Sequence, residues 1–162
     1  MKLPANFQTD DEWILKCFGT GAVADKFHQR THWRMVLIGE KGAGMFNHKD
    51  TLHSSSFQAQ VRGRKRWHLC DNTQTEYMYD AGRVNMFAPD YDKFPKALKA
   101  TCFDVVLNTG EMLYYPQNWW HQTTNMDDVN MAVSGTLVTK SNTPEITNEF
   151  KRECVKGKTS SR

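Results

Sequence analysis

Two histidines and one aspartate stand at positions suited to bind a metal ion. His48 and Asp50 are separated by one residue, Lys49. On an extended strand, residues i and i+2 point to the same face, so the imidazole and the carboxylate can reach one cation while Lys49 points away. A second histidine, His121, follows a short apolar stretch and Pro116 much further along the chain. We predict that these three side chains form one metal site.

Two histidines with one carboxylate are the ligand set of non-heme iron(II) oxygenases. They occupy three corners of an octahedron and leave three positions open. A 2-oxo acid can fill two open positions through its carboxylate and its ketone, and dioxygen (O2) can take the third. Because a His-x-Asp pair also occurs by chance, this prediction needs support from elsewhere in the chain.

A lysine one strand after the first ligand pair provides such support. Lys65 lies within Val61–Trp67, and a buried lysine opposite the iron can hold the distal carboxylate of 2-oxoglutarate as a point charge. Considered alone, Lys65 is better interpreted as an exposed residue of a basic run. The basic run Arg62, Arg64 and Arg66 is interpreted as a solvated strand face or as a stripe that binds a polyanion.

The segments around these residues resemble a known family. Residues 48–70, HKDTLHSSSFQAQVRGRKRWHLC, and residues 110–126, GEMLYYPQNWWHQTTNM, are similar to Jumonji C (JmjC) domains. The likeness is closest to the small protein hydroxylases that include the phosphatidylserine-receptor-like lysyl hydroxylase and the asparaginyl hydroxylase of the hypoxia pathway. It runs from about residue 3 to residue 138 and depends on the combination of His-x-Asp, Gly-x-Lys-Arg-Trp and Pro-x-x-Trp-Trp-His.

The resemblance implies a role for each candidate site residue. It places His48, Asp50 and His121 at the positions of the iron(II) ligands. It places Lys65 at the position of the lysine that binds the C5 carboxylate of the 2-oxoglutarate cosubstrate. Cosubstrate contacts are further implied for three polar residues, namely Gln58, Ser134 and Thr136.

Two positions depart from the pattern of that family. Met45 stands three residues before the first histidine, where a threonine is frequent, and methionine cannot donate a hydrogen bond. Gln58 stands where close relatives have asparagine. We expect both differences to influence the affinity for 2-oxoglutarate.

Strands are the elements that must position these side chains. Short runs rich in β-branched and aromatic residues alternate with Gly, Asn, Asp and Pro, which predicts strands at Trp33–Ile38, Phe57–Val61, Arg66–Cys70, Phe103–Leu107, Met112–Tyr115 and Met131–Val138. This pattern indicates an all-β fold, a double-stranded β-helix of the jelly-roll, cupin-like kind. Helical signals flank it at Thr9–Phe18 and from Thr143 to about Cys154.

Aromatic pairs precede the second histidine of the site. Strand alternation predicts that one of Tyr114 and Tyr115 faces the cavity and that only one of Trp119 and Trp120 does so. We interpret the tryptophans mainly as core packing that aims the ligand. His68 has no partner at a characteristic spacing and is interpreted as a surface or packing residue.

A chain of 162 residues can bury enough apolar surface for one domain. We predict a single JmjC or cupin-like domain over residues 1–155 and a flexible basic tail over residues 156–162. The short lead-in before the first strand also fits a chain that lacks an N-terminal portion. Asp71–Ala100 is a long, weakly patterned insertion of the kind that builds binding surfaces.

Charge and cysteine content restrict the possible partners. The net charge of +3 does not indicate a nucleic acid, and no run approaches the roughly 20 apolar residues of a membrane span. The four cysteines form no Cys-x-x-Cys pair, so we expect a reducing compartment and separate, buried Cys70 and Cys102 side chains. We therefore expect an intracellular protein, nuclear or cytoplasmic, whose oligomeric state is left open.

Three functions agree with this pattern. The favoured one is an iron(II)- and 2-oxoglutarate-dependent dioxygenase that hydroxylates a lysyl or asparaginyl side chain of a protein or peptide substrate. The second is a histone lysine N-methyl demethylase, although many such enzymes carry His-x-Glu and further chromatin-reading or zinc modules. The third is a cupin-like binding module without catalytic activity.

Overall fold

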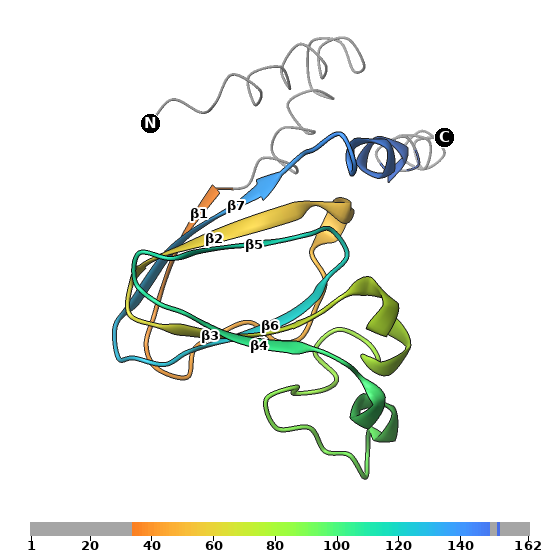
Figure 1. Cartoon of the computed structure of the whole chain (residues 1–162), viewed down its shortest axis with the longest axis horizontal. Coiled ribbons are helices and arrows are strands. Elements are labelled where there is room, and N and C mark those ends of the chain that lie inside the picture. The colour runs from red at the N-terminus through yellow and green to blue at the C-terminus, as the bar shows by residue number, and fades with distance from the viewer. Residues whose placement is uncertain (1–33, 150–151, 153–162) are drawn as a thin grey trace, which may run out of the picture.

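The computed structural model describes residues 34–149 and 152. Figure 1 shows two antiparallel β-sheets that face each other across the molecule. The larger sheet has the order β1-β7-β2-β5, formed by Arg34–Gly39, Asn130–Leu137, Ser55–Arg62 and Met112–Tyr115. The smaller sheet has the order β4-β3-β6, formed by Phe103–Leu107, Lys65–Cys70 and Trp120–Asn125.

Residues 42–48 complete the smaller sheet, because they run antiparallel beside β6 as an irregular fourth strand. At one end, the Asn125 amide donates a 2.8 Å hydrogen bond to the Ala43 carbonyl. At the other end, the backbones of His48 and His121 exchange two hydrogen bonds of 3.0 and 2.8 Å. Two opposed four-membered sheets form a jelly roll, so the predicted double-stranded β-helix is confirmed.

A glycine permits the close approach of this irregular strand to β6. A Cβ atom on Gly44 would lie 1.9 Å from the carbonyl oxygen of Thr123. No side chain fits in that space, so Gly44 sets the distance between the segment that carries His48 and the strand that carries His121.

Most predicted strands occur where the sequence places them. The strands Phe103–Leu107 and Met112–Tyr115 have the predicted ends, and the described ends of the other predicted strands differ by at most two residues. The strand β6 was not predicted. His121 and Thr123 of this strand line the cavity described below, and Gln122 and Thr124 on its other face are polar as well. The strand therefore lacks the apolar alternation that marks an ordinary strand.

The predictions for the chain ends are only partly testable. Residues 143–149 are helical, so the helix begins at the predicted Thr143. The predicted helix at Thr9–Phe18, the end of the domain at residue 155 and the tail at 156–162 lie outside the described residues. Within residues 34–149, no helix has the length and apolar character needed to span a lipid bilayer.

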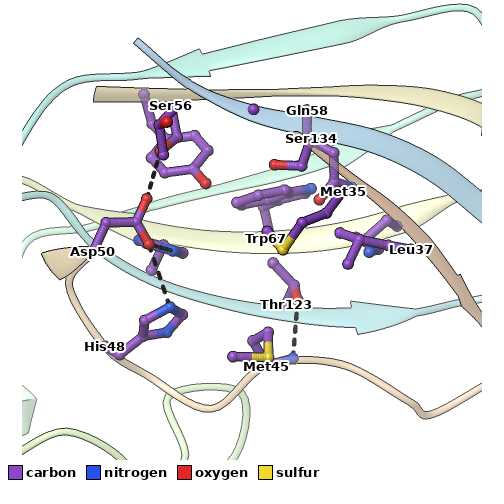
Figure 2. Close-up of a pocket in the computed structure, with 15 residues that line it drawn as sticks. Met35, Leu37, Met45, His48, Asp50, Ser56, Gln58, Trp67, Thr123 and Ser134 are labelled. Atoms are coloured by element: carbon purple, nitrogen blue, oxygen red, sulfur yellow. Dashed lines mark hydrogen bonds and ion pairs between the residues drawn. The ribbon is translucent and has the colours of Figure 1, made fainter. Parts of the chain in front are cut away.

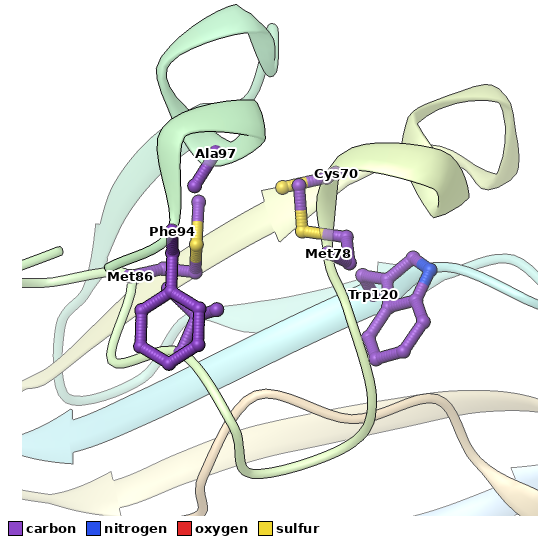
Figure 3. Close-up of a cluster of buried hydrophobic side chains, with 7 residues drawn as sticks. Cys70, Met78, Met86, Phe94, Ala97 and Trp120 are labelled. Carbon is purple, nitrogen blue, oxygen red and sulfur yellow. The ribbon is translucent and has the colours of Figure 1, made fainter. Parts of the chain in front are cut away.

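The insertion after β3 is ordered and has a small core of its own. It contains two 3-10 helices, η3 (Asn72–Tyr77) and η4 (Pro95–Lys99). Figure 3 shows the buried side chains between the insertion and the smaller sheet, which are Cys70, Met78, Val84, Met86, Phe94, Ala97 and Trp120. The insertion thereby covers the outer face of the strand that carries His121.

A disulfide bond joins Cys70 to Cys102, with 4.4 Å between the Cα atoms. The expectation that these cysteines are separate is therefore wrong. Leu69 of β3 pairs with Phe103 of β4, so the next residue on each side brings the two cysteines opposite each other. Their separation of 32 residues gave no sign of this pairing, because it depends on the strand register.

Candidate metal and cosubstrate site

A cavity of about 240 Å³ lies between the two sheets. Figure 2 shows its lining side chains, which come from both sheets and from the irregular strand. The structure brings together in it all of the predicted metal-binding and cosubstrate-binding residues, His48, Asp50, Gln58, Lys65, His121, Ser134 and Thr136.

The three predicted ligands converge at one end of this cavity. Their potential ligand atoms lie within 4.8 Å of one another. Asp50 Oδ1 is 3.6 Å from His48 Nε2 and 3.6 Å from His121 Nε2. This spacing and the donor set fit a single divalent iron, and the open side of the cluster faces the cavity.

Backbone carbonyl groups orient both imidazole rings. His48 Nδ1 lies 2.7 Å from the Phe46 carbonyl oxygen, and His121 Nδ1 lies 3.1 Å from the Trp119 carbonyl oxygen. A carbonyl oxygen only accepts hydrogen bonds, so each Nδ1 carries a proton. The lone pair on each Nε2 is therefore directed at the site, which is the arrangement that supports histidine ligands in metalloproteins.

A serine and the two histidines fix the carboxylate. Ser56 donates a 2.6 Å hydrogen bond to Asp50 Oδ2, which leaves Oδ1 for the metal (Figure 2). Burial acts to raise the pKa of Asp50, but the hydrogen bond with His48, the charge of His121 and the Ser56 hydroxyl outweigh it, so the pKa is lowered. The carboxyl group is thus ionised and ready to bind a cation.

The two histidines have opposite protonation tendencies. Burial lowers the pKa of His121 to about 4, so this ring is neutral at physiological pH. Burial also acts to lower the pKa of His48, but the hydrogen bonds to Asp50 and the Phe46 carbonyl outweigh it and raise the pKa. In the metal-free protein, His48 therefore keeps its second ring proton, on Nε2, to a higher pH than His121 does.

A buried lysine faces the same cavity. The residue Lys65 is only 6% exposed, and its ammonium group has no hydrogen bond or ion pair with any described residue. Burial lowers its pKa. An uncompensated buried cation is costly, so the cavity offers a favourable place for an anion at Lys65.

A threonine that the sequence analysis missed lies beside Met45. The Met45 amide donates to the hydroxyl of Thr123 at 3.1 Å, and the Thr123 amide donates to the Met45 carbonyl at 3.0 Å (Figure 2). The hydroxyl hydrogen of Thr123 is left to donate into the cavity. Thr123 is two residues after His121, so the strand period would have identified it if β6 had been recognised.

The remaining predicted cosubstrate residues form a polar wall on the larger sheet. Gln58 of β2 pairs with Ser134 of β7, and Ser56 pairs with Thr136. The Ser134 hydroxyl donates to the Phe57 carbonyl at 2.9 Å, which fixes its orientation. These neighbouring pairs place hydroxyl and amide groups opposite the sheet that carries Lys65.

The aromatic residues before His121 divide between the cavity and the core. Tyr115 is buried and lines the cavity, whereas Tyr114 is 52% exposed, as alternation predicted. Burial first and then the charge of Asp50 raise the pKa of Tyr115, so its hydroxyl stays protonated. Neither Trp119 nor Trp120 lines the cavity, so the prediction that one of them does is wrong. Trp120 packs under the insertion and Trp119 packs against the core around Trp67, which agrees with their interpretation as core packing.

The basic stripe is largely neutralised by acidic neighbours. The guanidinium of Arg64 forms two hydrogen bonds with Asp127, at 2.7 and 3.1 Å. Arg66 lies 3.3 Å from Asp104. These pairs favour the interpretation as a charged, solvated face over that of a polyanion-binding stripe.

Comparisons with known proteins agree with this geometry. A profile of the cupin-like domain family matches residues 7–135. HSPB1-associated protein 1 of Homo sapiens is 32% identical over 109 residues, which cover 61% of this chain and 22% of that protein. The 2-oxoglutarate and iron-dependent oxygenase JMJD4 of Danio rerio is 29% identical over 136 residues, which cover 78% of this chain and 30% of that protein.

A third relative has a different named activity. The arginine-specific demethylase JMJ20 of Arabidopsis thaliana is 32% identical over 101 residues, covering 59% of this chain and 22% of that protein. The chain thus spans between 22% and 30% of the length of these relatives. The matches confirm the resemblance to Jumonji C proteins that the motifs around His48 and His121 indicate.

Proposed function

The chain belongs to the cupin-like domain family, and from this premise we propose that it is an iron(II)- and 2-oxoglutarate-dependent oxygenase that hydroxylates a protein side chain. One observation supports the proposal more than any other. A cluster of two imidazoles and one carboxylate shares a cavity with a buried ammonium group, that of Lys65, which has no ion-pair partner among residues 34–149. The cluster suits iron(II), and the ammonium suits the far carboxylate of a 2-oxo diacid.

The protein groups have separate tasks in this reaction. Bound iron(II) and 2-oxoglutarate supply the chemistry that activates dioxygen for attack on a C–H bond. His48, Asp50 and His121 hold the metal from one side and leave its other positions to the cosubstrate and dioxygen. Lys65 and Thr123 orient the C5 carboxylate at the far end of the cavity.

The walls of the cavity exclude water from the reaction. Trp67 is 2% exposed and Tyr115 is 6% exposed, and both rings lie against the ring of His121, with centroid distances of 5.9 and 4.7 Å. The protonated Tyr115 hydroxyl lies near Asp50 and Ser56, so it can donate a hydrogen bond at the metal site without adding negative charge.

The names of two relatives support different products. The name of JMJD4 supports an oxygenase that uses iron and 2-oxoglutarate. The name of JMJ20 keeps demethylation as a second candidate, because removal of an N-methyl group begins with hydroxylation of its carbon. We favour side-chain hydroxylation because the motifs around His48 and His121 most resemble the small hydroxylases.

A product assay separates these candidates. Lysine-containing, asparagine-containing and N-methylated peptides would be incubated in air with the chain, iron(II), ascorbate and 2-oxoglutarate. We expect succinate and a peptide that gains one oxygen atom. Loss of a methyl group as formaldehyde would instead identify a demethylase. The His48→Ala variant is the blank, and absence of succinate above that blank would contradict both enzymatic functions and favour a binding module.

A further inference from the structure

A second cluster of metal-ligating side chains lies on the face of the smaller sheet that points away from the cavity. His68 of β3 pairs with Asp104 of β4, and the next same-face position on each strand is Cys70 or Cys102. Alternation directs the intervening Leu69 to the other face. The four residues therefore form a two-by-two block beneath the insertion.

The histidine of this block is oriented as a ligand. His68 Nδ1 lies 3.1 Å from Asp104 Oδ1, so the carboxylate accepts the Nδ1 proton. His68 Nε2 is buried and has no hydrogen-bond partner in the described part of the chain. A histidine that donates to a carboxylate and directs its other nitrogen inward is a recurrent feature of zinc sites. The sequence spacing gave no sign of the pairing between His68 and Asp104, because the register of β3 and β4 creates it.

The sulfur atoms complete a ligand set of the kind that zinc prefers. One ring nitrogen of His68 and the two cysteine sulfurs lie within 4.8 Å of one another. Cys70 is fully buried against the core of the insertion, where Figure 3 shows it next to Met78. Two thiolates and one imidazole are zinc ligands, and a tetrahedral ion keeps one further position for water.

We propose that the reduced chain binds zinc(II) through His68, Cys70 and Cys102, with Asp104 positioning the imidazole. A dithiol reductant transfers two electrons and two protons to the disulfide and itself becomes a disulfide, which leaves two thiols. Zinc(II) then displaces one proton from each thiol and forms two zinc–sulfur bonds. The end of the insertion is thus cross-linked to the smaller sheet by a disulfide in the oxidised chain and by zinc in the reduced chain.

Cobalt(II) distinguishes this site from the proposed iron site. The cluster of His48, Asp50 and His121 contains no sulfur, so only the second site can give a thiolate-to-cobalt charge-transfer band. The chain with Cys17→Ser and Cys154→Ser would be reduced with a dithiol, freed of the reductant without air and titrated with cobalt(II) and then zinc(II). We expect the band in the reduced protein, its absence in the oxidised protein and its loss when zinc is added.

Three variants decide which residues form the site. His68→Ala should remove the band or weaken cobalt binding at least tenfold. Asp104→Asn should weaken cobalt binding about 10- to 100-fold. His48→Ala should leave the band unchanged. Manganese(II) binding at the cavity serves as the folding control for His68→Ala. The proposal is overturned if the disulfide resists reduction, if two free thiols give no band, or if the band is insensitive to His68→Ala.

Discussion

At the scale of single residues, the site depends on the three metal ligands and equally on the groups that orient them. The sequence spacing predicted His48, Asp50 and His121. It could not predict the Ser56 hydroxyl that fixes Asp50, or the carbonyl groups that fix both imidazoles, because these contacts depend on backbone geometry. Lys65 was predicted from its motif, and its burial without a partner among the described residues gives that prediction a physical basis.

Replacing the buried lysine should separate cosubstrate binding from metal binding. Lys65→Met removes charge-assisted hydrogen bonds worth about 1.5–3 kcal/mol, so the KM for 2-oxoglutarate should rise about 10- to 150-fold. Metal affinity should not change, and the free energy of unfolding should not fall, because the substitution removes a buried charge that no described residue pairs with. Steady-state kinetics and thermal denaturation measure these effects, with Lys65→Arg as the control that keeps the charge. An unchanged KM would disprove the assigned role.

The serine beside the carboxylate should control metal affinity. Ser56→Ala removes the hydrogen bond to Asp50 Oδ2 and frees the carboxylate to rotate. We expect iron(II) affinity to fall about 10- to 100-fold, as for other groups that orient metal ligands. Competition titration with a chelator measures this affinity. Ser54→Ala is the matched control, since Ser54 is also buried but its hydroxyl bonds to the Thr51 carbonyl instead of Asp50.

Metal binding should release one proton in weakly acidic solution. At about pH 5.5, His48 is protonated, because its pKa is raised above the ordinary value of about 6.5. His121 is already neutral there, because its pKa is lowered to about 4. Calorimetry of manganese(II) binding in buffers of different ionisation enthalpy counts the protons. Two histidines with ordinary pKa values would release close to two protons. That result would contradict the opposite pKa shifts of His48 and His121.

At the scale of elements, the strands with apolar, β-branched or aromatic runs were predictable, and the mostly polar strand β6 was not. Phe103–Leu107 and Met112–Tyr115 alternate or carry continuous apolar residues, so the sequence located them. The strand β6 has the sequence WHQTTN and turns polar side chains inward, which removes the usual signal. The disulfide was missed for a related reason, since the β3–β4 register creates it.

The irregular strand at residues 42–48 gives a test at this scale. Gly44→Ala places a methyl group 1.9 Å from the Thr123 carbonyl, so the segment must move away from β6 and His48 must move with it. We expect lower thermal stability and at least tenfold weaker iron(II) binding. Gly42→Ala is the control for an added methyl group in the same segment, because a Cβ there meets no atom within 4 Å, although the φ of +84° at Gly42 makes that substitution strained. Equal losses of metal affinity in both variants would contradict the view that the close contact of Gly44 with Thr123 positions His48.

At the scale of the whole molecule, the two sheets bring distant segments of the chain to one cavity. The irregular strand carries His48, and Asp50 lies two residues further along the chain. The strand β6 carries His121, β3 carries Lys65, and β2 and β7 carry the polar wall. The insertion supports β6 from outside, through the bond from the Trp120 indole to Thr75 and the bond from the Met86 amide to Gln122. These contacts hold the residues on either side of His121.

Iron(II) and 2-oxoglutarate should bind together in this cavity, and anaerobic absorption spectroscopy shows whether they do. Iron(II) followed by 2-oxoglutarate should give the weak visible charge-transfer band of the iron–2-oxo acid chelate in the wild-type chain. Lys65→Met should need a higher concentration of 2-oxoglutarate to reach the same intensity, and His121→Ala should give no band. A wild-type chain that binds iron(II) but shows no band at saturating 2-oxoglutarate would contradict the joint binding of metal and cosubstrate in this cavity.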